Sequence, residues 1–213
     1  MRRVLSVSCV VIAAVALGAA GQKAPRKLIP DYSDAQKAEL DQVSDALNAI
    51  HTLKGGFLQI GPDGQVAQGE IYIEKPGKVR FAYAPPSPVL IVATGGTVYV
   101  RNSRLNTTDR YELADTPLGL ILNDKVDLKT NPAVMGVDKR DGTIVVQART
   151  STNRNQSNIQ LVFDAAGTEL RQWTVRDNQG GVTTVALQQL QPGVSLDQSL
   201  FTAPVKPRRP SQF

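Results

Sequence analysis

The side chains that could carry out chemistry in this 213-residue chain are few and stand apart from one another. The single histidine, His51, follows a stretch with helical periodicity, where it is typical of a helix C-terminus. Glu70 and Glu74 lie on one predicted strand, which separates their carboxylates by about 13 Å. That separation is too large for either arrangement of a glycosidase carboxylate pair, so we interpret both as charges on a solvated strand face.

The motifs of common enzyme and metal sites are missing as well. No G-x-S-x-G elbow offers a serine nucleophile, and no H-E-x-x-H motif or histidine–carboxylate cluster offers metal ligands. The stretch from Asp138 to Gly142 lacks the alternating oxygen ligands of a calcium loop. We therefore expect a protein that is not an enzyme and that holds neither a metal nor a cofactor.

The first twenty residues have the three parts of a cleavable export signal. Arg2 and Arg3 give a positive start, Val4 to Leu17 are almost without polar residues, and small residues lead to Ala20. We expect cleavage near Ala20, which makes residues 1–20 a signal peptide and places the protein in the periplasm. The alternative, an uncleaved anchor, requires about 20 apolar residues. Cys9, the only cysteine, lies inside this stretch in a poor context for lipidation.

The charge of the processed chain argues against a nucleic-acid partner. Removal of the signal lowers the formal charge from +5 to +3, because two arginines and no acids are lost. Part of the remaining charge lies in the tail, at Lys206, Arg208 and Arg209. The body is close to neutral, whereas nucleic-acid binders usually carry a basic face.

One domain is expected over residues 33–204, between a proline-containing linker at 21–32 and a basic, proline-rich tail at 205–213. It begins with a helix of about 17 residues, because Ser33 and Gln36 fit a capping box. An apolar stripe at three- and four-residue steps follows, formed by Leu40, Val43, Leu47 and Ile50.

After His51 the pattern changes to short strands with turn signals between them. The expected strands are 57–60, 69–74, 79–83, 89–93, 97–101, 110–113, 143–149, 159–164, 169–176 and 182–190. Thr116 to Leu122 interrupt the series as a short apolar helix, with Asp115 or Thr116 as its cap and Pro117 at its first position. This order predicts an antiparallel sheet that curls.

From Leu40 to Pro204 the chain resembles the LolA family of periplasmic outer-membrane lipoprotein carriers. The most specific stretch runs from Gln68 to Tyr83, where two strands flank a basic residue before proline. Shorter agreements are Phe57-Leu58-Gln59, Gly96 to Val100, Thr116 to Leu122 and Leu200 to Pro204. The chain departs from the family at Gly95, where aspartate is usual, and at Phe81 and Tyr99, where tryptophan is common.

The resemblance implies a mainly β (α+β) fold: an incomplete antiparallel β-barrel with an N-terminal helix and a short helical lid over an apolar concave face. Acyl chains would lie on this face, with Leu118, Leu120, Ile121 and Leu122 in the lid and Val79, Phe81 and Tyr83 in the sheet. A basic residue would hold the lid closed, and Lys75 matches it best, with Arg80 as a second candidate. The alternatives are ordinary core packing for the lid residues and a solvated strand charge for each basic residue.

The implied partners are acylated lipoproteins, an inner-membrane ABC exporter as donor and an outer-membrane acceptor, and we expect a monomer. Four other functions remain open: a LolA-like module for another lipid, an envelope-stress sensor domain, an envelope enzyme and a structural scaffold.

Overall fold

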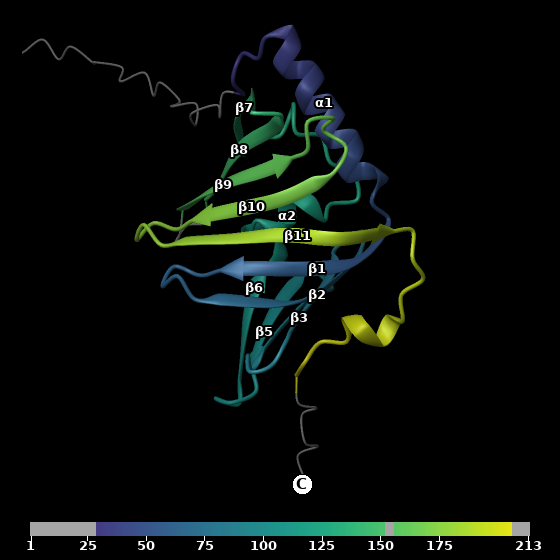
Figure 1. The fold of residues 1–213 in the computed structure, drawn as a ribbon, viewed down its shortest axis with the longest axis vertical. Coiled ribbons are helices and arrows are strands. Elements are labelled where there is room, and N and C mark those ends of the chain that lie inside the picture. The colour runs from purple at the N-terminus through teal and green to yellow at the C-terminus, as the bar shows by residue number, and fades with distance from the viewer. Residues whose placement is uncertain (1–28, 152–155, 206–213) are drawn as a thin grey trace, which may run out of the picture.

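Eleven antiparallel strands form one unclosed sheet in the computed structural model, which describes residues 29–151 and 156–205 (Figure 1). The first six strands are β1 (Thr52–Ile60), β2 (Val66–Glu74), β3 (Lys78–Tyr83), β4 (Val89–Thr94), β5 (Thr97–Asn102) and β6 (Thr107–Glu112). The last five are β7 (Val134–Arg140), β8 (Thr143–Ser151), β9 (Gln156–Phe163), β10 (Leu170–Arg176) and β11 (Val182–Pro192).

The strand order is β6-β5-β4-β3-β2-β1-β11-β10-β9-β8-β7. Two meanders are therefore joined where β1 pairs with β11, near the two ends of the domain. The predicted antiparallel sheet with an N-terminal helix and a short helix is confirmed. The sequence analysis missed β7, whose segment contains Gly136 and ends in three charged residues.

Helix α1 (Asp34–Ala49) begins at the predicted capping box. The Ser33 side chain accepts from the Gln36 backbone N–H at 3.3 Å, and the Ser33 N–H donates to the Gln36 side chain at 3.0 Å. Leu40, Val43 and Leu47 are fully buried. No helix in the described residues is long and apolar enough to span a membrane.

Three short helices complete the fold: η1 (Leu113–Asp115), α2 (Leu118–Ile121) and η2 (Gln198–Phe201). Helix α2 confirms the predicted short helix but begins one residue later than expected, with Pro117 as its N-cap and no capping side chain. The Thr116 hydroxyl instead donates to the carbonyl of Leu113, the first residue of η1. The sequence analysis missed η2, which is capped by Asp197.

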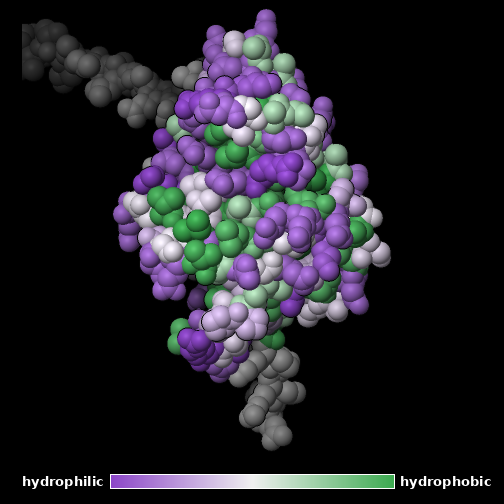
Figure 2. All heavy atoms as spheres, in the orientation of Figure 1, coloured by the Kyte–Doolittle hydropathy of each residue, from purple (hydrophilic) through white to green (hydrophobic). Residues whose placement is uncertain are grey.

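The two faces of the sheet differ in polarity. The inner face carries buried residues that lie side by side across the strands, such as Leu53, Ile73, Val79 and Ala93. Helices α1 and α2 lie behind the sheet in the view of Figure 1. The outer face, seen in Figure 2, is more hydrophilic, with apolar atoms gathered mainly over the left ends of β1 and β11. The core therefore sits between the inner face and the helices.

The two edges of the sheet are protected in different ways. At β7, the Tyr32 hydroxyl donates to the Val134 carbonyl and the Gln36 amide to the Val137 carbonyl, both at 3.3 Å. Tyr32, at the end of the expected linker, is itself buried. Strand β6 instead consists of two threonines, a tyrosine and three charged residues, most of them exposed. Charges on an edge strand discourage pairing with other chains.

Gly69 makes room for the aromatic residues of the inner face. It pairs with Phe57 of β1 on one side and with Tyr83 of β3 on the other. A Cβ at position 69 would lie 2.9 Å from the Phe57 ring and would overlap the carbonyl oxygen of Ala82. The Phe57 ring can therefore lie over β2 only because residue 69 has no side chain.

We predict that Gly69→Ala lowers the free energy of unfolding by about 1–3 kcal/mol, the usual cost of overpacking a core. Urea unfolding followed by circular dichroism measures this change. The matched control is Gly136→Ala, also in a strand, where an added Cβ would meet no atom within 4 Å. Equal stability of the two variants would show that the close approach at Gly69 is unimportant.

Candidate functional site

The inner face of the sheet is covered by one assembly of helices, which we call the helical cover: α1, α2 and residues 122–130. Of the candidate lid residues, Leu120, Ile121 and Leu122 are buried in it and Leu118 is half-buried. They belong to the same apolar cluster as Val79 and Phe81 of the sheet, with Tyr83 packed at its margin. The structure thus brings the predicted apolar site residues together.

The space left beneath the helical cover is small and mostly apolar. A cavity of about 190 Å³ lies between the C-terminal end of α1, α2 and strands β1, β2 and β11. Ile50, Ile121 and Leu187 are among its eight apolar lining residues. Pockets for small molecules usually measure about 300–1,000 Å³. The cavity is therefore too small for a long acyl chain while the helical cover remains in place.

A row of aromatic rings crosses the inner face next to this cavity. Phe57 packs edge-to-face on Tyr83 and Phe81, with ring centroids 4.9 and 5.3 Å apart, and Phe81 packs on Trp173 at 6.1 Å. At the end of the row, the Tyr83 hydroxyl donates to the Gln59 side chain at 2.7 Å. Burial raises the pKa of Tyr83 to about 12. The four rings form a continuous apolar surface that ends at the polar pair of Tyr83 and Gln59.

The inner face becomes accessible beyond this pair. Tyr83, Ile91 and Val100 are only half-buried and pack at the edge of the apolar cluster. A hollow of about 690 Å³ opens between the β1–β2 and β3–β4 loops, with Gln59 and Tyr83 in its wall. The covered part of the inner face is thus continuous with a more open, partly polar end.

Lys75 lies where the β2–β3 turn meets the helical cover. Its ammonium donates to the Leu47 carbonyl, in the last turn of α1, at 2.9 Å. A cation is favoured there because the helix dipole places partial negative charge on the last carbonyls. Burial lowers the pKa of Lys75. Two residues on, the Gly77 N–H donates to the Leu122 carbonyl at 2.9 Å, so one turn contacts the ends of both α1 and α2.

Arg80, the second basic candidate, points away from the helical cover. Its guanidinium donates to the Leu200 carbonyl of η2 at 3.1 Å, on the outer face of the sheet. The neighbours of Arg80 in β3, Val79 and Phe81, are buried on the inner face, and alternate residues of a strand point to opposite faces. The structure therefore brings Lys75, and not Arg80, to the helices.

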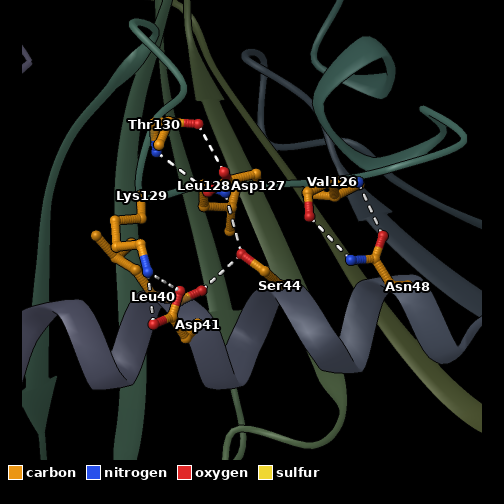
Figure 3. A network of polar contacts seen from close by, with 9 residues as sticks. All are labelled: Leu40, Asp41, Ser44, Asn48, Val126, Asp127, Leu128, Lys129 and Thr130. Atoms are coloured by element: carbon orange, nitrogen blue, oxygen red, sulfur yellow. Dashed lines mark hydrogen bonds and ion pairs between the residues drawn. The ribbon is translucent and has the colours of Figure 1, made fainter.

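Polar residues of α1 join it to the segment after α2, as Figure 3 shows. The buried Ser44 hydroxyl donates to the Leu40 carbonyl at 2.6 Å and accepts from the Leu128 N–H at 3.0 Å. The Asn48 side chain makes two hydrogen bonds to the backbone of Val126: it donates to the carbonyl at 2.9 Å and accepts from the N–H at 2.8 Å.

An ion pair between Asp41 and Lys129, at 2.6 Å, lies along the same side of α1. The helical cover is therefore held together by this ion pair and by the bonds from Ser44 and Asn48 to backbone groups. The sequence analysis missed Ser44 and Asn48. The available signal was Ser44 itself, which lies in the apolar stripe between Val43 and Leu47.

We predict that Ser44→Ala costs about 1–3 kcal/mol of stability, because the buried Leu128 N–H loses its partner. Amide hydrogen exchange should speed up in residues 126–130, and denaturant unfolding gives the overall cost. Asp45→Ala, on the exposed side of the same helix, should leave both measurements unchanged. Unchanged exchange of 126–130 in Ser44→Ala would mean that the segment does not depend on the Ser44 hydroxyl.

The amino-acid sequence is similar to those of known proteins over most of its length. The Outer-membrane lipoprotein carrier protein of Methylococcus capsulatus is 25% identical over 178 residues, which cover 79% of this chain and 85% of that protein. The protein of the same description from Cupriavidus necator is 28% identical over 185 residues, with coverages of 80% and 86%.

Among solved structures, a LolA superfamily protein from Nitrosomonas europaea aligns with a TM-score of 0.39 and 10% identity, over 76% of this chain and 97% of its own. This overlap is too low to add to the fold described above. The family model described as "Outer membrane lipoprotein carrier protein LolA" matches residues 48–204, which begin in the last turn of α1 and end after η2. The chain therefore belongs to the LolA family.

Proposed function

We propose that this protein binds the acyl chains of lipoproteins and carries them through the periplasm from the inner to the outer membrane. The observation that carries the proposal is an apolar inner face that is closed by the protein's own helices and fastened at the β2–β3 turn. Membership of the LolA family and the names of its relatives support it.

The energetics explain why such a carrier needs a large apolar surface. Transfer of an acyl chain of about 16 carbons from water is worth roughly 12 kcal/mol, at about 0.8 kcal/mol for each methylene group. The buried residues of the inner face and of the helical cover together offer apolar contacts for such a chain. The chain would lie on Val79, Phe81 and Tyr83 after the helical cover has moved.

The closed state makes release possible. Leu120, Ile121 and Leu122 pack on the inner face, so a ligand must displace them. A ligand that binds only the open state has its apparent affinity reduced by the fraction of molecules that are open. The helical cover thus acts as a lid. When the cargo leaves, the lid packs on the inner face again, and this packing offsets part of the free energy that is lost with the cargo.

Lys75 is the side chain that we assign to holding this lid closed. It bonds the last turn of α1 from the sheet and is half-buried. A lysine offers one compact charge rather than the planar, bidentate guanidinium of an arginine. Its hydrogen bond to the helix is therefore weaker and breaks more easily.

The proposal includes the route and the partners. Residues 1–20, outside the described part of the chain, would direct export and be removed near Ala20. An inner-membrane ABC exporter would donate the lipoprotein and an outer-membrane acceptor would receive it. The protein would act as a monomer, without enzymatic activity of its own.

The direct test is uptake of an acylated lipoprotein by the purified, processed protein. We expect a soluble complex of one carrier and one lipoprotein by gel filtration. The non-acylated form of the same lipoprotein is the control and should not bind. Folded protein that binds neither would leave a scaffold or a sensor domain as the better description.

We predict that Lys75→Leu leaves lipoprotein uptake intact and impairs delivery to outer-membrane vesicles. The variant lowers the cost of opening the lid, so the cargo is held more tightly. The matched control is Lys54→Leu: Lys54 pairs with Glu70 at 3.4 Å on the outer face, away from the helices. Delivery at the wild-type rate by Lys75→Leu would remove Lys75 from the mechanism.

A further inference from the structure

The chain after β11 packs on the outer face of the sheet, where η2 contacts β3 and β4 (Figure 1). Phe201 of η2 is only 3% exposed, and Val92 of β4 is fully buried. In the described part of the chain, these are the two buried apolar residues outside the large cluster of the inner face. Val92 lies opposite Arg80, whose side chain reaches Leu200. The C-terminal segment, residues 197–205, therefore covers a small second core.

Side chains from both strands next to the β2–β3 turn hold this segment. Lys78 donates to the Gln198 side chain at 2.7 Å, and Gln198 donates to Glu74 at 2.8 Å. Lys78 also pairs with Glu74 at 2.7 Å and lies 5.7 Å from the centroid of the Phe201 ring. With the bond from Arg80 to Leu200, the contacts fix the segment to residues 74–80.

The same residues contact the helical cover on the other side of the sheet. Within 74–80, Lys75 bonds Leu47 at the end of α1 and Gly77 bonds Leu122 at the end of α2. Glu74, Lys78 and Arg80 bond the C-terminal segment. One hairpin turn is thus held from both faces of the sheet, and its position affects both sets of contacts.

We propose that the C-terminal segment positions the β2–β3 turn so that Lys75 and Gly77 meet the carbonyls of the helical cover. Arg80, Gln198 and Phe201 are then positioning residues for the lid contact that the proposed function assigns to Lys75. Coupling between two sites is reciprocal. Displacement of the segment loosens the helical cover, and opening of the cover loosens the segment.

The test measures hydrogen exchange of α1 and of residues 118–130 in the processed protein, with no lipid present. Arg80→Met keeps the aliphatic stem and removes the bond to Leu200, and Phe201→Ala removes the buried ring. Each variant should raise exchange in the helical cover by at least about fivefold, the lower end of typical coupling between sites. If Phe201→Ala does not fold, Arg80→Met decides the test alone.

The matched control is Arg176→Met. Arg176 ends β10 on the outer face, because Trp173 and Val175 point inward, and it donates to the Gly180 carbonyl at 3.4 Å. Among the described residues it has no bond to the C-terminal segment or to the β2–β3 turn. This variant should leave exchange in the helical cover unchanged. An equal rise in Arg176→Met and Arg80→Met would overturn the proposal, because it would reflect general loss of stability.

The Lys75→Leu background separates positioning from a structural role. If Arg80 acts through the turn, Arg80→Met should add less exchange in the helical cover once Lys75 is gone, because only the bond from Gly77 to Leu122 is left to be positioned. Full additivity would overturn the proposal. So would faster exchange in the C-terminal segment with an unchanged helical cover. Lipoprotein uptake is a separate measurement: coupling without uptake rejects the proposed function alone, and uptake without coupling rejects this inference alone.

Discussion

An open sheet with an apolar inner face cannot remain uncovered in water, and this constraint shapes the rest of the molecule. The eleven strands do not close, since β6 and β7 end the sheet at opposite edges. Something apolar must therefore fill the concavity, and the stripe of α1 and the leucines around α2 do so. The inner face and the helices thus bury each other's apolar surface.

The contacts within the helical cover differ from those between the cover and the sheet. Inside the cover, Ser44 and Asn48 bond backbone groups of Leu128 and Val126, which joins segments distant in sequence into one body. Between the cover and the sheet, polar contacts lie at the β2–β3 turn, and α1 also bonds the Val137 carbonyl of β7 and the Ala166 carbonyl between β9 and β10. The remaining attraction there is apolar packing, which is non-directional and can be replaced by another apolar surface. An acyl chain is such a surface.

Much of the fold follows from local patterns in the sequence. The capping box at Ser33 and the stripe from Leu40 to Leu47 were sufficient for α1, and alternating residues for most strands. Strand β7 was missed because Gly136 and its charged end weaken the alternation, and its place depends on pairing with β8. The β2–β3 turn follows from the local signal Pro76-Gly77, whereas the role of Lys75 was inferred from the resemblance to a family and not from any local rule.

The remaining features of the site depend on contacts between distant segments. Lys75 meets Leu47 across 28 residues, and Arg80 meets Leu200 across 120. The pattern of residues along one strand does not show whether Lys75 or Arg80 faces the helices. That depends on how β2 and β3 pair with their neighbours. Ser44 also needed tertiary structure, because its partner is the Leu128 backbone.

The free edge at β6 bears on whether copies of the protein can join. If two copies paired through β6 as antiparallel strands about a two-fold axis, the central residue would face itself. With Asp109 or Arg110 at that centre, identical charges would lie directly opposite each other, which destabilises a strand pair. The other edge is occupied by Tyr32 and Gln36. Both edges of the sheet therefore carry features that oppose its extension by a second copy.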